Sequence, residues 1–222
     1  MPRNVAKLVT PPRVNRDMVN PFTPEEARTF IQVLHGDRLE AFFVTTLACG
    51  LRQGEALALR WSDVDLEKAE LRVNTTLQRV DEQWVFAEPK SKESRRLAPV
   101  PSVAVQALRE HRTRQWQERL QVGPLWLDQD LVFATHTGGS AGAGNVIRSF
   151  QRVLEEAGLR HQRIHDLRHG CASLLAASGA SLTEVKEILG HSQISITADL
   201  YTHIFDKTKR DAMDLMDAVL AR

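Results

Sequence analysis

The sequence predicts a mainly α-helical protein with a small three-stranded antiparallel β-sheet, that is, an α+β fold. Apolar residues recur at helical spacing from residue 23, and again from residue 101 to the end. Between 70 and 100 the chain instead holds short runs of β-branched and aromatic residues separated by polar breaks. Apolar residues make up 42% and charged residues 26% of the 222, which is ordinary for a globular protein with a normal core.

Residues 1–22 are expected to form a linker or N-terminal extension. They contain four of the nine prolines and a single acidic residue, Asp17, and they show no apolar periodicity. The folded domain is therefore expected to cover residues 23–222.

The first helix is predicted to begin after Thr23. Threonine is a favoured N-cap, Pro24 suits the first helical position, and Glu26 completes a capping box. Apolar residues at helical spacing predict two further helices near 38–49 and 53–60.

The runs ELRVNTTLQRV, QWVFAEP and RRLAPVP, all between 70 and 100, are predicted to be strands joined by hairpins. Helical patterns then return. They predict helices near 101–121, 144–158, 166–178, 182–189, 195–202 and 206–220.

Composition excludes several classes of protein. The only cysteines, Cys49 and Cys171, give no disulfide framework and suit a reducing compartment. No apolar run approaches the ~20 residues of a membrane span and no signal peptide is recognisable, so we expect a cytoplasmic protein with no membrane partner. The net charge of +1 is not that of a strongly basic nucleic-acid binder, so composition alone does not indicate DNA.

The motif HDLRH at 165–169 can be interpreted as a metal site. His165 and His169 are four residues apart and share one helical face, as two zinc ligands would. Further ligands could come from Cys171, His191 and His203. However, Asp166 stands where the HExxH motif has its glutamate, and the cation of Arg168 on the same side is unfavourable beside a metal ion.

A second motif, GGSAG at 138–142, matches the GxSxG pattern of a hydrolase nucleophile elbow, with Ser140 as the nucleophile. A glycine-rich loop before a helix is also common for conformational reasons alone. The chain lacks the repeated strand–helix alternation of the hydrolase fold.

The alternative interpretation of HDLRH is a phosphate site. Arg168 offers a planar fork that matches two phosphate oxygens, and His165, three residues earlier, can donate a hydrogen bond or move a proton. An ordinary polar helix start, with Asp166 near the cap, explains the motif equally well.

Three further stretches favour the phosphate site. Arg52 follows Gly50-Leu51 between two apolar helices, where a lone cation needs a partner. A helix capped by Ser181 should end at Gly190, and this fixes the position of His191 on the following turn. The only tyrosine, Tyr201, lies ten residues after His191.

Together, GLRQGEALAL, EPKSKESRRLAPVP, HDLRH, LGHS and LYTHI resemble the motifs of the tyrosine recombinase (phage integrase) family in order and approximate spacing. The resemblance covers about residues 22–205 and implies the family's catalytic-domain fold. It also implies six active-site residues, which are Arg52, Lys90, His165, Arg168, His191 and Tyr201. Lys90 follows a proline as in the family pattern, and Lys92 in the same hairpin is the alternative.

The resemblance implies a site-specific recombinase that acts on double-stranded DNA through a phosphotyrosine intermediate at Tyr201, with no metal ion, cofactor or ATP. It implies a homotetramer on DNA that exchanges the C-terminal helix, here 206–220, and a monomer when free. The family's N-terminal DNA-clamping domain is expected to be absent from this chain.

Type IB topoisomerases use nearly the same residues, but the small size and the spacing from LGHS to the tyrosine favour an integrase. A metal-dependent phosphohydrolase and a catalytically silent DNA-binding module remain alternatives from other classes, and a silent module would be expected to have lost one of the six residues.

Overall fold

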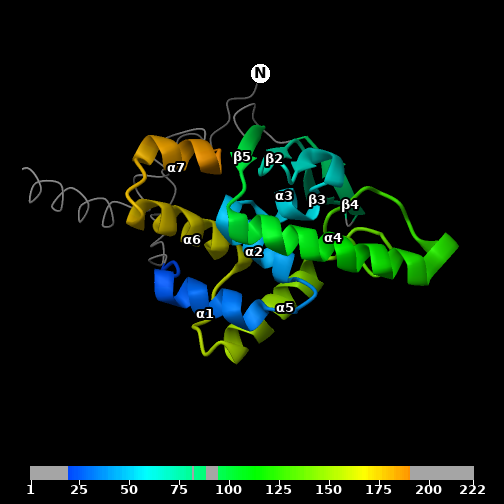
Figure 1. The fold of residues 1–222 in the computed structure, drawn as a ribbon, viewed down its shortest axis with the longest axis horizontal. Helices are drawn as coiled ribbons and strands as arrows, with labels where there is room; N and C mark the ends of the chain where they lie inside the picture. The colour runs from blue at the N-terminus through cyan, green and yellow to red at the C-terminus, as the bar shows by residue number, and fades with distance from the viewer. Residues whose placement is uncertain (1–19, 82, 89–94, 191–222) are drawn as a thin grey trace, which may run out of the picture.

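The computed structural model describes residues 20–81, 83–88 and 95–190, and within these ranges it is mostly helical (Figure 1). The α-helices there are α1 (Pro24–Leu34), α2 (Glu40–Cys49), α3 (Gln53–Leu57), α4 (Ser102–Val122), α5 (Ala143–Glu156), α6 (Ile164–Ala177) and α7 (Leu182–Leu189). Short 3-10 turns are η2 (Trp61–Asp63) and η4 (Gly123–Leu125). The predicted helices up to residue 189 are therefore confirmed, although α3 ends three residues earlier than expected. The helices expected at 195–202 and 206–220 lie outside the described residues.

Helix α2 lies at the centre of the fold, between α4 and α6 (Figure 1). Its sequence, EAFFVTTLAC, is apolar on nearly every side, and nine of its ten residues are buried. A helix that is apolar all round has no face to present to water, so it must be enclosed by other elements. This central position places its C-terminal end, Cys49 and the following Gly50, in the interior.

The helix caps predicted from the sequence are present. Thr23 Oγ1 accepts a hydrogen bond from the amide of Glu26 at 3.2 Å, and the Glu26 carboxylate accepts one from the amide of Thr23 at 2.8 Å. Ser181 and Glu184 form the same reciprocal pair at α7. Each pair satisfies two backbone groups that the first turn of a helix leaves without partners.

The predicted three-stranded antiparallel sheet is present, but its strands differ from those expected. It consists of β1 (Val64–Asp65), β2 (Glu70–Val73) and β5 (Arg96–Pro99) in the order β1-β2-β5. The run ELRVNTTLQRV divides into β2 and β3 (Thr76–Val80), and β3 pairs with β4 (Gln83–Ala87) in a separate two-stranded sheet. The division falls next to Asn74, whose side-chain amide donates to Asp63 Oδ1 at 2.9 Å.

Six phenylalanines form the centre of the main core around α2. Their rings are in contact with centroids 5.2–6.1 Å apart, mostly edge to face or tilted: Phe22, Phe30, Phe42, Phe43, Phe133 and Phe150. Phe22, the last residue of the expected linker, is thus part of the core. A smaller cluster under α7 contains Cys171, Ala172, Val185 and Leu189. Helix α7 is therefore held in place by a small set of contacts, with α6 and with β5.

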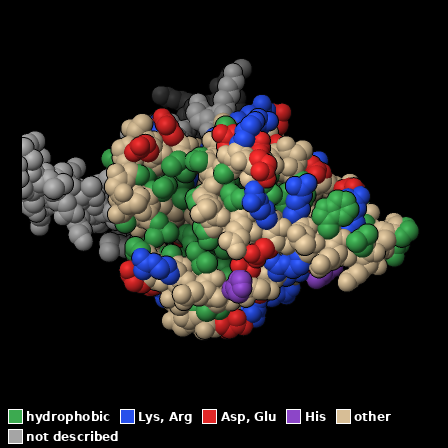
Figure 2. Space-filling model, in the orientation of Figure 1, with side chains coloured by type: hydrophobic (Ala, Val, Ile, Leu, Met, Phe, Trp, Pro, Cys, Tyr) green, Lys and Arg blue, Asp and Glu red, His purple; other side chains and the backbone are tan. Residues whose placement is uncertain are grey.

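Both signs of charge are interspersed over the face shown in Figure 2, and hydrophobic side chains gather at the far end of α4. Trp116, Leu120 and Leu125 are exposed there. None of the described helices combines the length and the apolarity needed to cross a bilayer.

Candidate active site

Arg168 is the most deeply placed of the predicted site residues. It lies on α6 and is only 2% exposed. Its Nη1 donates to the carbonyl of Gly50 at 2.6 Å, and its Nη2 donates to the carbonyl of Leu189 at 2.6 Å. Gly50 follows α2 and Leu189 ends α7, so one guanidinium joins three helices. Each carbonyl belongs to a helix end, where it has no intrahelical partner.

Two glycines, Gly50 at the end of α2 and Gly170 on α6, allow this close approach. A Cβ atom added to Gly170 would lie 3.0 Å from Leu47 Cδ1 of α2. A Cβ atom on Gly50 would lie 2.3 Å from Leu189 Cδ2 and 3.2 Å from Cys171 Sγ. Gly50 also has a φ of +60°, which costs a residue with a side chain more than it costs glycine. Glycine at 50 and at 170 therefore lets α2, α6 and α7 meet around Arg168.

Arg168 remains a cation at neutral pH. Burial, followed by the positive charge of Arg52, lowers the pKa of Arg168 to about 9. Because the charge of Arg52 contributes to the lowered pKa, the two guanidiniums lie close enough for their charges to repel each other. An anion placed between them would relieve the repulsion and would be attracted by both.

Arg52 stands at the N-cap of α3, and its side chain is 37% exposed. Its Nη1 donates to Glu55 Oε1 at 2.6 Å, and its amide donates to Glu55 Oε2 at 3.0 Å. Glu55 thus holds both the backbone and the side chain of Arg52. The guanidinium is fixed on one side and open to solvent on the other.

His165 lies on the first turn of α6, exposed, three residues before Arg168. Partial burial of the ring, followed by the charge of Arg168, lowers the pKa of His165, and Arg52 acts in the same direction. The imidazole is therefore neutral near pH 7 and can accept a proton. The structure thus brings Arg52 together with His165 and Arg168, although Arg52 lies more than a hundred residues before them in the sequence.

His169 has a different environment from His165. It is 9% exposed, and burial, followed by the charge of His165, lowers its pKa to about 4. Its ring meets that of His165 edge to face, with centroids 4.9 Å apart. His169 therefore supports the position of His165 from within α6.

Asp166 acts as a helix cap. Its Oδ2 accepts from the amide of Arg163 at 2.8 Å, and its Oδ1 accepts from Arg163 Nη2 at 2.9 Å. The polar helix start considered from the sequence is thus present, and it positions α6 so that Arg168, two residues after Asp166, points inward.

The remaining candidates lie outside the described residues: Lys90 with its alternative Lys92, His191 and Tyr201. The structure does place the residue before His191. Gly190 ends α7 with a φ of +65°, as predicted for a glycine after a helix. The backbone that leads to His191 is therefore held next to the carbonyl bonded by Arg168.

The described residues bear on the two other interpretations of the motifs. Among them, no three His, Cys, Asp or Glu side chains are close enough to hold a metal ion. Two of the possible ligands in the metal interpretation, His191 and His203, lie outside the described residues. Ser140 forms an isolated bridge with Ala134 and does not have the positive φ seen at three other non-glycine positions. It therefore lacks the strained turn that exposes the serine of a nucleophile elbow.

Two buried charged residues at the site were not predicted. Glu55 is 4% exposed, and the side chain of Arg96 on β5 is 6% exposed. Arg96 Nη2 donates to Glu55 Oε2 at 3.1 Å, and Arg96 Nε donates to the carbonyl of Ile188 at 2.8 Å. Glu55 could have been found as the N3 residue of a capping box after Arg52.

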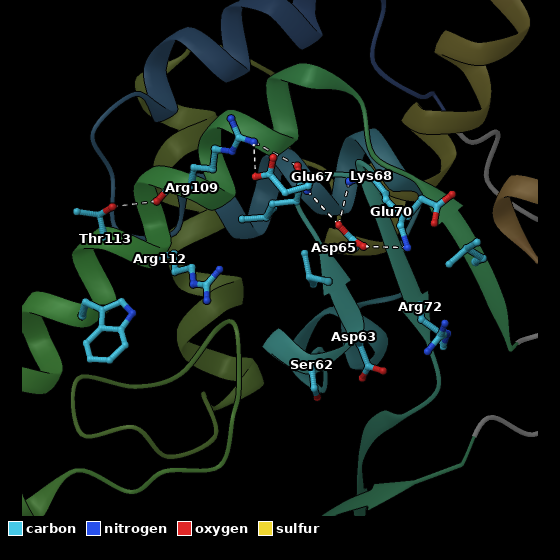
Figure 3. A pocket seen from close by; sticks show the side chains of 14 residues that line it. Ser62, Asp63, Asp65, Glu67, Lys68, Glu70, Arg72, Arg109, Arg112 and Thr113 are labelled. Carbon is cyan, nitrogen blue, oxygen red and sulfur yellow. Dashed lines mark hydrogen bonds and ion pairs between the residues drawn. The ribbon is translucent and has the colours of Figure 1, made fainter.

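A groove of about 810 Å³ lies between α4 and the β1–β2 hairpin (Figure 3). Its charges neutralise one another: Arg109 pairs with Glu67 at 3.0 Å, and Lys68 pairs with Asp65 at 3.5 Å. None of the three gathered candidates lines it. The positively charged site around Arg168 is therefore separate from this groove.

The sequence matches the model of the phage integrase family over residues 20–208. The chain belongs to the phage integrase family. The match includes Arg52, His165 and Arg168, which the fold brings together. The α+β fold around the buried Arg168 is accordingly the catalytic-domain fold of tyrosine recombinases.

Curated relatives and solved structures agree with this family. The chain is 37% identical to the "Tyrosine recombinase XerC-like" protein of Caldanaerobacter subterraneus subsp. tengcongensis over 94% of this chain and 56% of that protein. It is 29% identical to the "ICEBs1 integrase" of Bacillus subtilis over 89% of this chain and 54% of that protein. The chain thus spans a little over half the length of these relatives.

Among solved structures, the Tn1549 transposon integrase in complex with circular intermediate DNA superposes with a TM-score of 0.70 at 25% identity, covering 90% of this chain and 68% of that one. The XerA recombinase superposes with a TM-score of 0.69 at 24% identity, covering 93% and 66%. The likeness to XerA shows the shared fold.

Proposed function

We propose that this integrase-family chain cleaves and rejoins DNA strands at a specific site in double-stranded DNA. The observation that carries the proposal is the meeting of Arg52, His165 and Arg168, two cations and a neutral imidazole, at one partly open place. Phosphodiester cleavage builds negative charge on a pentavalent phosphoryl group, and preorganised cationic donors are the strongest means of stabilising it. The Tn1549 integrase, which shares the fold, was solved in complex with DNA.

In the proposed reaction Tyr201 attacks the scissile phosphate. Its oxygen forms a bond to phosphorus, and the 5′-oxygen of the next nucleotide leaves, so that a 3′-phosphotyrosine and a free 5′-hydroxyl result. The covalent bond preserves the energy of the cleaved one, so religation needs no ATP. Reversal with a 5′-hydroxyl from another strand completes recombination.

The other residues supply charge and proton transfer. Arg52 and Arg168 hold the non-bridging oxygens, and His191 donates a third hydrogen bond. The pKa of a free tyrosine is about 10, so Tyr201 needs a base, and neutral His165 is suited to accept its proton. Lys90, or Lys92 in its place, protonates the leaving oxygen. The two guanidiniums supply the positive charge that a metal ion provides in other phosphoryl-transfer enzymes.

Assembly on DNA is the second part of the proposal. The apolar face of residues 206–220 docks on a neighbouring protomer in a homotetramer that forms on DNA, while the free chain is a monomer. Deleting 206–222 should then reduce assembly on DNA and leave the melting temperature nearly unchanged. A deletion that unfolds the domain would show that the segment packs on its own protomer.

The function is tested by covalent trapping. Nicked suicide duplexes from a panel of candidate attachment sites should form a protein–DNA adduct that survives denaturation. Tyr201→Phe should bind the same duplexes with nearly unchanged affinity and form no adduct. Adduct formation by Tyr201→Phe would refute the nucleophile, and binding without any adduct would identify a silent DNA-binding module.

A further inference from the structure

Arg96 joins three parts of the candidate site through one buried side chain. It begins β5, where it pairs with Val73 of β2. Its Nη2 bonds Glu55, which holds Arg52, and its Nε bonds the carbonyl of Ile188 in the last turn of α7. None of the six residues that the family resemblance names has this position.

Two arginines together complete the end of α7. The carbonyls of Ile188 and Leu189 have no partner within the helix, because they belong to its last turn. Arg96 donates to the first and Arg168 donates to the second. The segment that leads to His191 is thus held from β5 and from α6 at once.

Arg96 also sets the charge around Glu55. Burial raises the pKa of Glu55, but the charge of Arg96 and the hydrogen bond from the amide of Arg52 outweigh it, so the pKa of this carboxyl is lowered. One carboxylate shared by two guanidiniums leaves a net positive charge on the group. If Arg96 were absent, Glu55 would neutralise Arg52 alone, and the phosphate would meet one positive charge fewer.

We propose that Arg96 is a positioning residue for strand cleavage, which keeps Arg52 and the end of α7 in their working arrangement and leaves Arg52 with charge to offer the phosphate. The inference rests on the proposed function. It predicts that Arg96 affects the rate of cleavage on bound DNA more than the binding of DNA. The contacts that give Arg96 this role are its bonds to Glu55 and to the carbonyl of Ile188.

The variants are Arg96→Met, which keeps length and removes charge, and Arg96→Lys, which keeps charge but cannot reach Glu55 and Ile188 together. Arg72→Met is the matched control, because Arg72 is exposed on the neighbouring strand of the same sheet and loses the same charge. Melting curves identify any variant that has lost its fold. Arg96→Lys, which retains the charge, keeps the test decisive if Arg96→Met is too unstable.

The first measurement uses no DNA. The side-chain carboxyl of Glu55 is titrated by carbon-detected NMR, and amide exchange is followed across residues 186–190. In Arg96→Met the pKa of Glu55 should rise and the end of α7 should exchange faster, while Arg72→Met should change neither. An unchanged Glu55 titration and unchanged exchange would overturn the inference.

The second measurement is single-turnover trapping on the nicked duplex that the unaltered chain attacks. At saturating DNA, Arg96→Met should react about 10- to 100-fold more slowly, since small displacements of catalytic groups have effects of this size. Arg96→Lys should lie between Arg96→Met and the unaltered chain, and the DNA dissociation constant should change no more than in Arg72→Met. Equal rates for Arg96→Met and Arg72→Met would overturn the inference. If the unaltered chain forms no adduct, the proposed function fails, and the DNA-free measurement alone decides the place of Arg96.

Discussion

Replacing Gly50 with alanine should destabilise the domain through the contact between α2 and α7. The added Cβ would lie 2.3 Å from Leu189 Cδ2, about 1.2 Å short of an ordinary carbon–carbon contact. Leu189 is fully buried against Val185 and Ala172, so its side chain has little room to move away from the added Cβ. Relieving such an overlap costs about 1–3 kcal/mol, and the left-handed backbone adds about 1 kcal/mol. The free energy of unfolding should therefore fall by about 2–4 kcal/mol.

Gly158→Ala separates the two contributions. Gly158 has a φ of +63°, close to that of Gly50, but an added Cβ there would meet nothing within 4 Å. Gly158→Ala should therefore lower the free energy of unfolding only by the cost of the left-handed backbone, about 1 kcal/mol. Urea unfolding of both variants gives the difference, and amide exchange should show faster exchange in α7 for Gly50→Ala only. Equal losses in the two variants would refute the account of close packing at Gly50.

Three further outcomes are expected. Thr23→Ala should lower the free energy of unfolding by about 1 kcal/mol, because it removes the acceptor of the Glu26 amide. If urea unfolding shows a loss of less than a few tenths of a kcal/mol, the role of the cap is contradicted. Burial lowers the pKa of His111 and of His169 to about 4, so the folded chain keeps both rings neutral while the unfolded chain protonates them below about pH 6.5. The free energy of unfolding should therefore fall on acidification, by about 2 kcal/mol for each ring between about pH 7.5 and about pH 5. In His111→Gln this fall should be smaller by the contribution of His111. If the fall in His111→Gln equals that of the unaltered chain, the burial of a neutral His111 is not its cause. Burial raises the pKa of both Cys49 and Cys171 to about 12, so a thiol reagent should label them only as fast as the domain opens, and immediate labelling of the folded chain would contradict their burial.

The helices were predictable because their signals are local. The capping boxes after Thr23 and Ser181 lie within four residues of chain, and the structure contains both. The sheet was predicted less well, because pairing depends on partners far along the chain. Nothing in ELRVNTTLQRV shows that Asn74 bonds Asp63 beside a break between two strands.

The sequence could name candidate residues of the site one at a time, but not the contacts between them. Arg168 could be chosen from its motif, but its bonds to two helix ends could not, because they depend on the arrangement of α2 and α7. Arg96 was missed for a related reason. Along β5 it shares the inward side with Ala98 and Val100, whereas Leu97, the larger apolar residue, is 54% exposed. Side chains do alternate between the two faces of this strand, but the size and apolarity of Leu97 indicated that its face, and not that of Arg96, would be buried.

The bonds from Arg168 to Gly50 and Leu189 change what can be learned from relatives that have lost their activity. A chain that no longer cleaves DNA still has to join α2, α6 and α7, and natural selection for folding alone would retain arginine at 168. Its presence is therefore a poor indicator that a family member is active. For the same reason Arg168→Ala would be an unsuitable inactive control, since it would alter the scaffold together with the proposed chemistry, and such a control is better made at Tyr201, the proposed nucleophile.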